Sequence, residues 1–145
     1  MSFQSNLPGP FNLGDLIDAS RDLDEIALID LGGESGAREF TFRELDTLAN
    51  GVARALLKRG IVRGERVAIL SGNRVEYLAA FYGALRAGVV AVPVNFRFPR
   101  ELTAFVIRDA GARLVFCDLQ RRANCPPDLP VVEFGGSGGA SFDSF

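Results

Sequence analysis

Short apolar segments alternate with helix-like segments through most of this chain, and that alternation limits the possible folds more than any other feature. The apolar segments are residues 66–70, 89–92, 113–117 and 131–134. Two helix-like segments, residues 73–87 and 99–110, separate the first three, and a glycine follows each. Strands and helices that alternate through short connections predict a parallel sheet with right-handed crossovers. We therefore expect an α/β fold with a mostly parallel sheet and helices on both faces.

The clearest single helix signal is FTFRELDTLANGVARALLKRG, residues 40–60. Thr41 and Glu44 have the spacing of a capping box, in which each side chain accepts a hydrogen bond from the other residue's backbone N–H. Apolar residues then recur at helical spacing along one stripe, namely Leu45, Leu48, Ala49, Val52 and Leu56. Gly60 is placed to end the helix in a left-handed conformation.

The region before this helix is less regular. Residues 13–22 predict a short helix with Leu16 and Ile17 directed inward, and residues 26–31 predict a strand. The glycine-rich stretch LGGESGARE, residues 31–39, predicts a turn, after which residues 38–41 return to an extended conformation.

These segments divide the chain into three parts. We expect a loose N-terminal segment over residues 1–12, a single α/β subdomain over residues 13–134, and a flexible tail rich in Gly and Ser over residues 135–145. A length of 145 residues is enough for one domain.

The longest apolar run, residues 77–94, approaches the length of a membrane span. Arg86 lies in its middle, where a charge costs at least about 2.5 kcal/mol in a bilayer. Gly88 follows at once, and Pro93 closes the run. The run therefore predicts a helix, a turn and a buried parallel strand, and no membrane span.

Composition excludes several classes of function. The net charge of −2 provides no basic field for nucleic acid. The chain has no His, which removes the commonest general base and metal ligand. Cys117 and Cys125 are too few and too far apart for a zinc knuckle or a CxxC redox pair, and we expect one core thiol and one loop thiol in a reducing compartment. The N-terminus lacks signal-peptide features, so a cytoplasmic protein is expected.

Polar residues that follow the predicted strands are the candidates for ligand contact, because ligands of open α/β sheets bind beyond the carboxyl ends of the strands. These residues are Ser71, Gly72, Asn73, Asn95 and Asp118. The alternative is structural: Asn73 caps a helix, whereas Asn95 and Asp118 shape turns.

The tail segment FGGSGGASF, residues 134–142, invites comparison with a phosphate-binding loop. It lacks the spacing of such a loop, the Lys that should follow and any helical pattern after it, and therefore favours a flexible linker. A nucleophile also needs a neighbouring base, and no His or paired carboxylates provide one. From the residues alone we assign no catalytic, cofactor-binding or metal-binding residue.

Residues 13–118 resemble the N-terminal part of the adenylate-forming (AMP-binding) enzymes, of the acyl-CoA synthetase type. Phe40-Thr41-Phe42-Arg43-Glu44-Leu45 resembles an early signature of that superfamily. Leu85-Arg86-Ala87-Gly88, continuing through Pro93-Val94-Asn95, resembles a second. Asn95 stands where peptide-synthetase domains more often have Asp, which favours acyl-CoA synthetases.

The resemblance implies a whole enzyme that uses ATP and Mg²⁺ to convert a carboxylic acid to an acyl-adenylate and then transfers the acyl group to CoA. The family's phosphate loop, its later ATP-site motifs and its C-terminal domain have no counterpart in this sequence. Both signatures that are present have structural roles, so the resemblance implies no cofactor bound by this chain and no catalytic residue in it. We expect an inactive N-terminal fragment whose partner is the remainder of the parent enzyme.

Two other interpretations stay open. The chain can be a naturally short binding or assembly module built on the same half-domain, or, less well supported, a flavodoxin-like nucleotide binder. A half-domain without its neighbours also leaves apolar surface uncovered, which predicts a homo-oligomer formed through a sheet face or edge.

Overall fold

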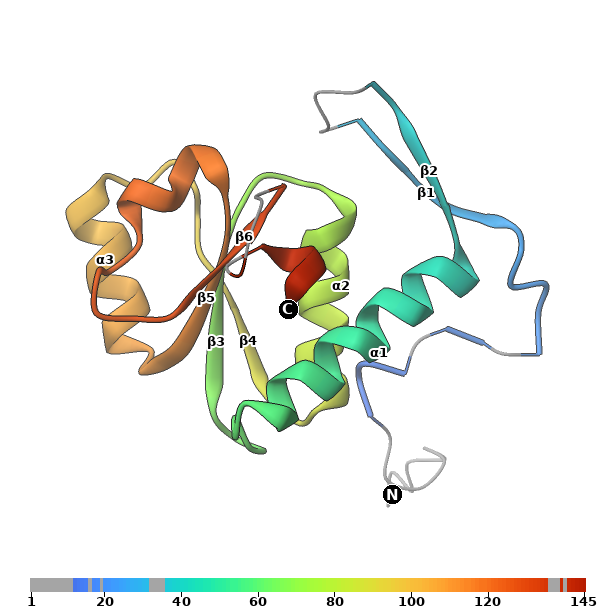
Figure 1. Cartoon of the computed structure of the whole chain (residues 1–145), viewed down its shortest axis with the longest axis horizontal. Coiled ribbons are helices and arrows are strands. Elements are labelled where there is room, and N and C mark those ends of the chain that lie inside the picture. The colour runs from blue at the N-terminus through green and yellow to red at the C-terminus, as the bar shows by residue number, and fades with distance from the viewer. Residues whose placement is uncertain (1–11, 16, 19, 32–35, 136–138, 140) are drawn as a thin grey trace, which may run out of the picture.

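The computed structural model describes residues 12–15, 17–18, 20–31, 36–135, 139 and 141–145. Its main strands are β3 (Arg66–Leu70), β4 (Val90–Pro93), β5 (Ala112–Asp118) and β6 (Val131–Phe134). They form one parallel sheet in the order β4-β3-β5-β6 (Figure 1). The helices are α1 (Phe42–Lys58), α2 (Val75–Arg86) and α3 (Arg100–Asp109), with the 3-10 helices η1 (Leu119–Asn124) and η2 (Phe142–Ser144). The predicted α/β fold is confirmed.

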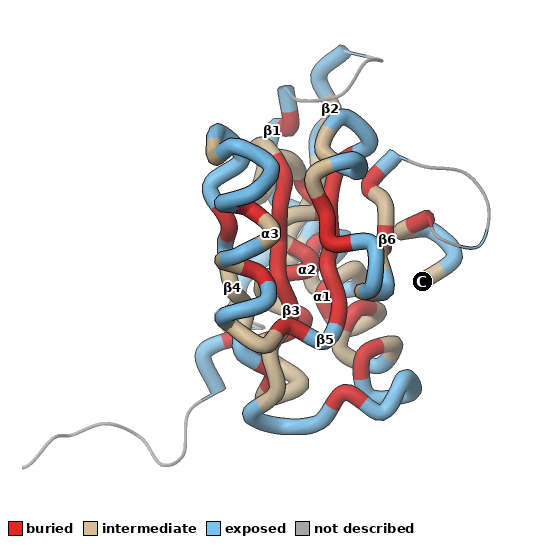
Figure 2. The backbone as a smooth tube through the Cα atoms, turned by 90° about the vertical axis from the view of Figure 1, so that its left-hand side faces the viewer, coloured by how far each residue is buried: buried red, intermediate tan, exposed pale blue. Residues whose placement is uncertain are grey.

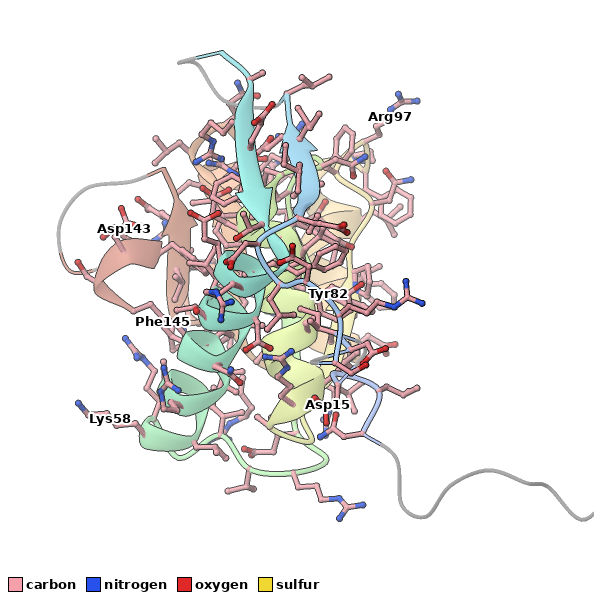
Figure 3. All side chains as sticks on the ribbon, turned by 90° about the vertical axis from the view of Figure 1, so that its right-hand side faces the viewer. Asp15, Lys58, Tyr82, Arg97, Asp143 and Phe145 are labelled. Atoms are coloured by element: carbon pink, nitrogen blue, oxygen red, sulfur yellow. The ribbon has the colours of Figure 1, made fainter. Side chains whose placement is uncertain are left out.

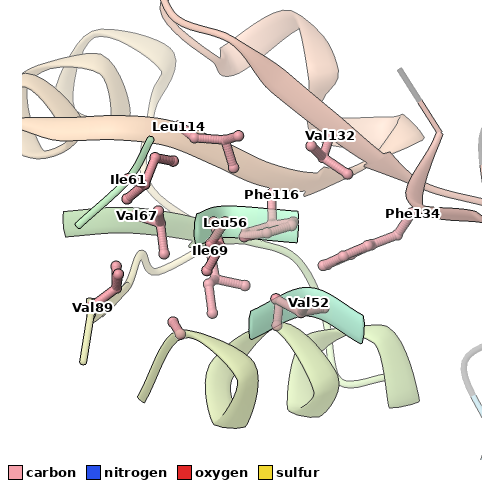
Figure 4. Close-up of a cluster of buried hydrophobic side chains, with 12 residues drawn as sticks. Val52, Leu56, Ile61, Val67, Ile69, Val89, Leu114, Phe116, Val132 and Phe134 are labelled. Carbon is pink, nitrogen blue, oxygen red and sulfur yellow. The ribbon is translucent and has the colours of Figure 1, made fainter. Parts of the chain in front are cut away.

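Helices cover both faces of this sheet, as predicted. One core lies between the sheet and the helices α1 and α2, and Figure 4 shows Val52 and Leu56 of α1 facing Ile69 and Phe116 of the sheet. A second core on the opposite face contains Ile107 of α3 together with side chains of β3 and β5. The central strands β3 and β5 are accordingly the most buried part of the backbone (Figure 2).

Helix α1 begins and ends as its sequence predicts. The Thr41 hydroxyl accepts a hydrogen bond from the Glu44 N–H at 3.2 Å, and the Glu44 carboxylate accepts one from the Thr41 N–H at 2.8 Å. At the other end Gly60 has a φ of 75°, and the Ile61 N–H donates to the Leu56 carbonyl at 3.1 Å. These bonds satisfy backbone groups that a helix terminus otherwise leaves without partners.

Helices α1 and α2 pack closely because one residue at their contact lacks a side chain. A Cβ atom on Gly83 of α2 would lie 2.5 Å from the Val52 Cβ atom and 2.7 Å from the Ala49 carbonyl oxygen, both on α1. Only glycine permits this approach, and it fixes how deeply α1 sits against α2.

The helix predicted over residues 13–22 is wrong for the part of that range that the structure describes, which contains turns and bends. Leu16 and residues 1–11 lie outside the described residues, so the inward placement of Leu16 and the loose N-terminal segment stay predictions. Short polar side chains explain the turns. The Asn12 side chain accepts from the Gly14 N–H at 2.8 Å, and Asp18 accepts from the Ser20 N–H at 3.0 Å, bonds that compete with a helix.

Arg86, the charge inside the longest apolar run, holds this N-terminal region against the helices. Its side chain is 10% exposed and donates to the Gly14 carbonyl at 2.8 Å, and to the Asp46 carbonyl at 3.1 Å and the Asn50 side chain at 2.9 Å on α1. Within the described residues, no helix has the length and apolarity that crossing a bilayer requires.

Strand β4 is parallel, as predicted, but the expectation that it is a buried strand is wrong. It lies at the edge of the sheet, and Val90 is 47% exposed. The Val90 and Val94 N–H groups donate inward, to Glu65 at 2.8 Å and Ile69 at 2.9 Å. Pro93 lies between Val90 and Val94 in the strand and has no backbone N–H, so it leaves no unpaired donor on the open side of the sheet. A proline is therefore tolerated in this edge strand.

The apolar spacing of residues 99–110 predicts that Leu102, Phe105 and Val106 form the inner face of α3, and the structure differs from this prediction. Thr103 and Ile107 are fully buried and Val106 is half-buried, whereas Leu102 and Phe105 are 41% and 61% exposed. The spacing of apolar residues gave an incorrect face because Thr103 takes a core position. Its hydroxyl donates to the Phe98 carbonyl at 3.3 Å, so its polar group is satisfied there.

Ahead of α1, β1 (Ile26–Asp30) and β2 (Arg38–Thr41) form a separate antiparallel hairpin. Figure 1 shows it extending away from the four-stranded sheet, beyond the start of α1. The two strands agree with the sequence. The predicted turn falls partly on residues 32–35, which lie outside the described residues.

Candidate functional site

A cleft of about 460 Å³ opens at the carboxyl ends of β3, β5 and β6, where the sequence placed the candidate residues. Ser71, Gly72, Asn73 and Asp118 all line it, joined by side chains from the hairpin and from η2. Asn95 does not line it. Its side chain accepts from the Arg97 N–H at 3.0 Å and holds a turn, as its structural alternative predicted.

Asp118 organises the floor of this cleft. It is 8% exposed, and its carboxylate accepts from the Gly72 N–H after β3 and from the Arg121 N–H in η1, both at 3.1 Å. The Arg121 guanidinium also forms an ion pair with it. Asp118 therefore joins the ends of two neighbouring strands and caps η1, and its carboxylate is engaged by groups of the chain itself.

A second polar network forms the wall of the cleft nearest the hairpin. Arg38 of β2 forms ion pairs with Asp30 of β1 and with Glu76 of α2, the latter at 3.1 Å. Arg74 donates to the other side of the Glu76 carboxylate at 2.6 Å. The Asp30 carboxylate accepts from the Val75 N–H at 3.1 Å. This network ties the hairpin to the first turn of α2.

The electrostatics of the cleft are dominated by these internal pairs. Burial alone would raise the pKa of Glu76, but hydrogen bonds and the charges of Arg74 and Arg38 outweigh it and lower the pKa below its ordinary value. Desolvation alone would lower the pKa of Arg38, but its hydrogen bonds and ion pairs with Asp30 and Glu76 outweigh this effect and raise the pKa above its ordinary value. The three arginines that line the cleft, Arg38, Arg74 and Arg121, each pair with an acid.

The prediction that Asn73 caps the following helix is wrong. The residue before α2 is Arg74, whose side chain makes no cap bond, and Asn73 is exposed at the rim of the cleft. The acceptor for the first N–H of α2 comes instead from Asp30, 45 residues earlier. No local pattern around Asn73 could reveal a cap that arrives from another element.

The phosphate-loop comparison over residues 134–142 falls partly outside the described residues, which omit 136–138 and 140. Gly135 has a φ of 75°, and the element that follows is the three-residue 3-10 helix η2 rather than an α-helix. Where the sequence predicted a flexible tail, Phe142 and Phe145 pack against the main core. Among the described residues, no group of three or more His, Cys, Asp or Glu side chains could hold a metal ion.

The two cysteines lie in the same buried cluster, although they are eight residues apart in the sequence. Both are buried in the α3-side core, at 0% and 4% exposure, and the Cys125 thiol donates a hydrogen bond to the Arg121 carbonyl at 3.8 Å. The interaction between the two thiols lowers the pKa of Cys125 and, with burial, raises the pKa of Cys117. Cys117 is the expected core thiol and Cys125 is the expected loop thiol, in the bend after η1. The burial of Cys125 was not predicted, and it arises because η1 folds this residue back onto the end of β5.

Comparison with known proteins assigns the fold to a family. The family model described as "AMP-binding enzyme" matches residues 17–136. The chain therefore belongs to the AMP-binding enzyme family, and its sequence is that of an N-terminal portion of the acyl-CoA synthetase/ligase type.

Individual relatives show how much of the family this chain represents. A long-chain-fatty-acid–CoA ligase of Mycobacterium tuberculosis is 41% identical over 93 residues, which is 64% of this chain and 17% of the ligase. A 3-hydroxybenzoate–CoA ligase of Aromatoleum is 39% identical over 85 residues, or 59% and 16% of the two chains. The Brucella canis acyl-CoA synthetase structure matches with a TM-score of 0.67 and 26% identity, covering 79% of this chain and 22% of that one. The chain thus spans about a fifth of these relatives.

Proposed function

We propose that this chain is the first α/β part of an ATP-dependent carboxylic acid:CoA ligase that works through an acyl-adenylate, and that by itself it is not catalytic. The family match over residues 17–136 carries the proposal, together with the small share of each relative that the chain covers. The relatives named above are ligases that join carboxylic acids to CoA, which supports a carboxylic acid as the substrate of the whole enzyme.

The charges of the cleft support the absence of catalysis in the isolated chain. Adenylation requires Mg²⁺ together with cationic or N–H groups, all of which offset the negative charge of the ATP phosphates. Arg38, Arg74 and Arg121 are already neutralised by Asp30, Glu76 and Asp118. The described residues of this cleft therefore do not fit a triphosphate, and we derive no reaction step through ATP, Mg²⁺ or CoA from them.

The structural role we propose is to support the rest of the enzyme, which is the chain's partner. Two apolar surfaces are available for that contact. On the hairpin, Ile26, Ile29 and Leu31 are 53%, 54% and 78% exposed beside a groove of about 550 Å³ against α2. On α3, Leu102 and Phe105 face outward. A second copy of the chain can use the same surfaces when the remainder is absent. Two neighbouring free thiols fit a reducing compartment and support a cytoplasmic location.

Transplantation tests this role directly. The segment of the Mycobacterium tuberculosis ligase that matches this chain is replaced by the corresponding residues of this chain, and fatty-acid-dependent ATP–pyrophosphate exchange is measured. We expect exchange within about tenfold of the unmodified ligase, because the transplanted residues have a structural role. A chimera with a cooperative thermal transition and no exchange contradicts the proposal.

The second candidate is a non-catalytic binding or assembly module on the same half-domain. One observation favours it: Phe142 and Phe145, which lie beyond the family match, cover part of the core. Reading the coding DNA after Phe145 separates the two candidates. A frame that continues into a Gly-rich loop ending in Lys supports the ligase, and a stop codon with its own expression signals supports the module.

A further inference from the structure

The end of the sheet near β6 carries a cluster of four phenylalanines. Phe116 of β5 and Phe134 of β6 are 0% and 1% exposed and stack with ring centroids 6.0 Å apart. Phe142 contacts Phe134 edge to face at 5.4 Å, and Phe145 contacts Phe116 in the same way at 5.2 Å. Figure 4 shows Phe116 and Phe134 converging on the space beside α1. Phe142 and Phe145 therefore supply part of the cover that keeps two core rings out of water.

The turn between these two residues makes the double contact possible. Phe142 and Phe145 are three positions apart across η2, and residues three apart eclipse one another in a 3-10 helix. The Ser141 and Ser144 hydroxyls hydrogen-bond each other at 3.0 Å across the same turn. The segment thus presents both rings on one side.

Polar contacts fix the position of this segment on the body of the protein. Arg59, just after α1, donates to the Phe145 carbonyl at 3.1 Å, and its guanidinium lies 4.0 Å from the centre of the Phe145 ring. At the start of the segment, Ser141 is 4% exposed and pairs with Glu133 as an isolated parallel bridge beside β6. Figure 3 shows Phe145 lying against α1 and Asp143 on the outer side of the turn.

We propose that Phe116, Phe134 and Arg59 form a docking site for a Phe-x-x-Phe segment, and that residues 141–145 of the same molecule occupy it. The site selects two aromatic rings spaced three residues apart, with a backbone carbonyl placed for Arg59. The family match ends at residue 136, before this segment begins. The proposal does not depend on ligase activity in the whole enzyme.

The first test removes both rings within the full chain, as Phe142→Ala with Phe145→Ala. We expect the Tm to fall by about 10 °C and a dye that binds exposed apolar surface to become fluorescent, because two core rings lose their cover. The matched control is Phe105→Ala, which removes a ring that is 61% exposed and should leave both readouts unchanged. If the double variant fails to fold, the milder Phe145→Leu variant should show a smaller fall in Tm.

The second test supplies the segment in trans. A chain ending at residue 140 is titrated with an acetylated Ser141–Phe145 peptide, and NMR shifts are followed at Phe116, Phe134 and Arg59. We expect saturable shifts confined to these residues, and none with a peptide in which both phenylalanines are alanine. A double variant with wild-type Tm and no dye binding would overturn the proposal, as would equal shifts with the two peptides. A wild-type dimer that the double variant abolishes would instead assign the site to the segment of a second copy.

Discussion

The carboxylate of Asp30, the last residue of β1, accepts a hydrogen bond at 3.1 Å from the backbone N–H of Val75, the first residue of α2. The first N–H groups of a helix need such acceptors, and a negative charge at this end also interacts favourably with the helix dipole. The cap usually comes from the residue just before the helix, whereas here it comes from a separate hairpin. The position of the hairpin and the integrity of the helix terminus are therefore linked.

Replacing Asp30 by Ala should lower the free energy of unfolding by about 2–4 kcal/mol. The change removes a helix cap and leaves Arg38 without one of its two acidic partners. Asp24→Ala is the matched control, because Asp24 pairs with Arg43 at an exposed site and such pairs contribute little. Urea unfolding of the three proteins measures both effects. Equal urea midpoints for the Asp30 and Asp24 variants would show that the contacts of Asp30 with α2 and Arg38 do not stabilise the folded chain.

Glu76 makes the stability of this network depend on pH. Its pKa in the folded chain lies below the ordinary value of 4.5, so the unfolded chain takes up the proton first as pH falls. The contribution of Glu76 is fully present above about pH 4.5 and is lost as pH falls through the folded pKa. The stability difference between the wild type and Glu76→Gln should therefore be larger at pH 7 than at pH 3. Urea midpoints at both pH values check this, and a difference that grows toward pH 3 would be the contrary result.

Two glycines in neighbouring helices give opposite expectations for the same substitution. Gly83→Ala places a Cβ atom 2.5 Å from Val52 and should destabilise by about 1–3 kcal/mol through overpacking. Gly51, in the interior of α1, has nothing within 4 Å of the added atom, so Gly51→Ala should stabilise by about 1 kcal/mol through helix propensity. Thermal unfolding measures both variants. A stabilising effect at both positions would mean that α1 and α2 are not in close contact.

The cysteine pair predicts unequal reactivity. Cys125 lines a surface groove and its pKa is lowered by its interaction with the Cys117 thiol, whereas the pKa of Cys117 is raised. Iodoacetamide should alkylate Cys125 before Cys117 in the folded protein, since the thiolate is the reactive form. Cys117→Ala removes the neighbouring thiol and should slow the alkylation of Cys125 at pH 7. Peptide mass spectrometry follows both reactions, and a faster reaction at Cys117 would contradict the assignment.

Most helices and strands of the main body could be predicted from the sequence, because the residues that determine each one lie within a short stretch of the chain. The capping box of Thr41 and Glu44 and the glycine after α1 lie where the structure has them. Strand β3 also has its predicted bounds. In each case the hydrogen bonds or apolar contacts involved join residues close in sequence, so one stretch of chain contains the information.

The errors arose where distant parts of the chain decide the outcome. No pattern near residue 89 tells an edge strand from a central one, because that depends on which other strands pair with β4. The cap of α2 depends on Asp30, which lies 45 residues earlier in the chain. In the candidate site, four of the five polar residues do meet at one cleft, as the rule for parallel sheets predicts. The ion pair between Arg38 of the hairpin and Glu76 of α2, which forms one wall of this cleft, was not predictable from strand ends alone.

We propose that this chain has the fold of an AMP-binding enzyme but no adenylation activity of its own, and ATP–pyrophosphate exchange by the purified chain measures that activity. The chain is assayed with Mg²⁺ and carboxylic acids of the two classes used by its relatives, a long-chain fatty acid and 3-hydroxybenzoate, beside the chimeric ligase as a positive control. We predict exchange in the chimera and none above background in the 145-residue chain, since losing even one charge-stabilising group costs about 100-fold or more. Exchange activity that follows the isolated chain through every purification step would show that the chain adenylates without the rest of the enzyme.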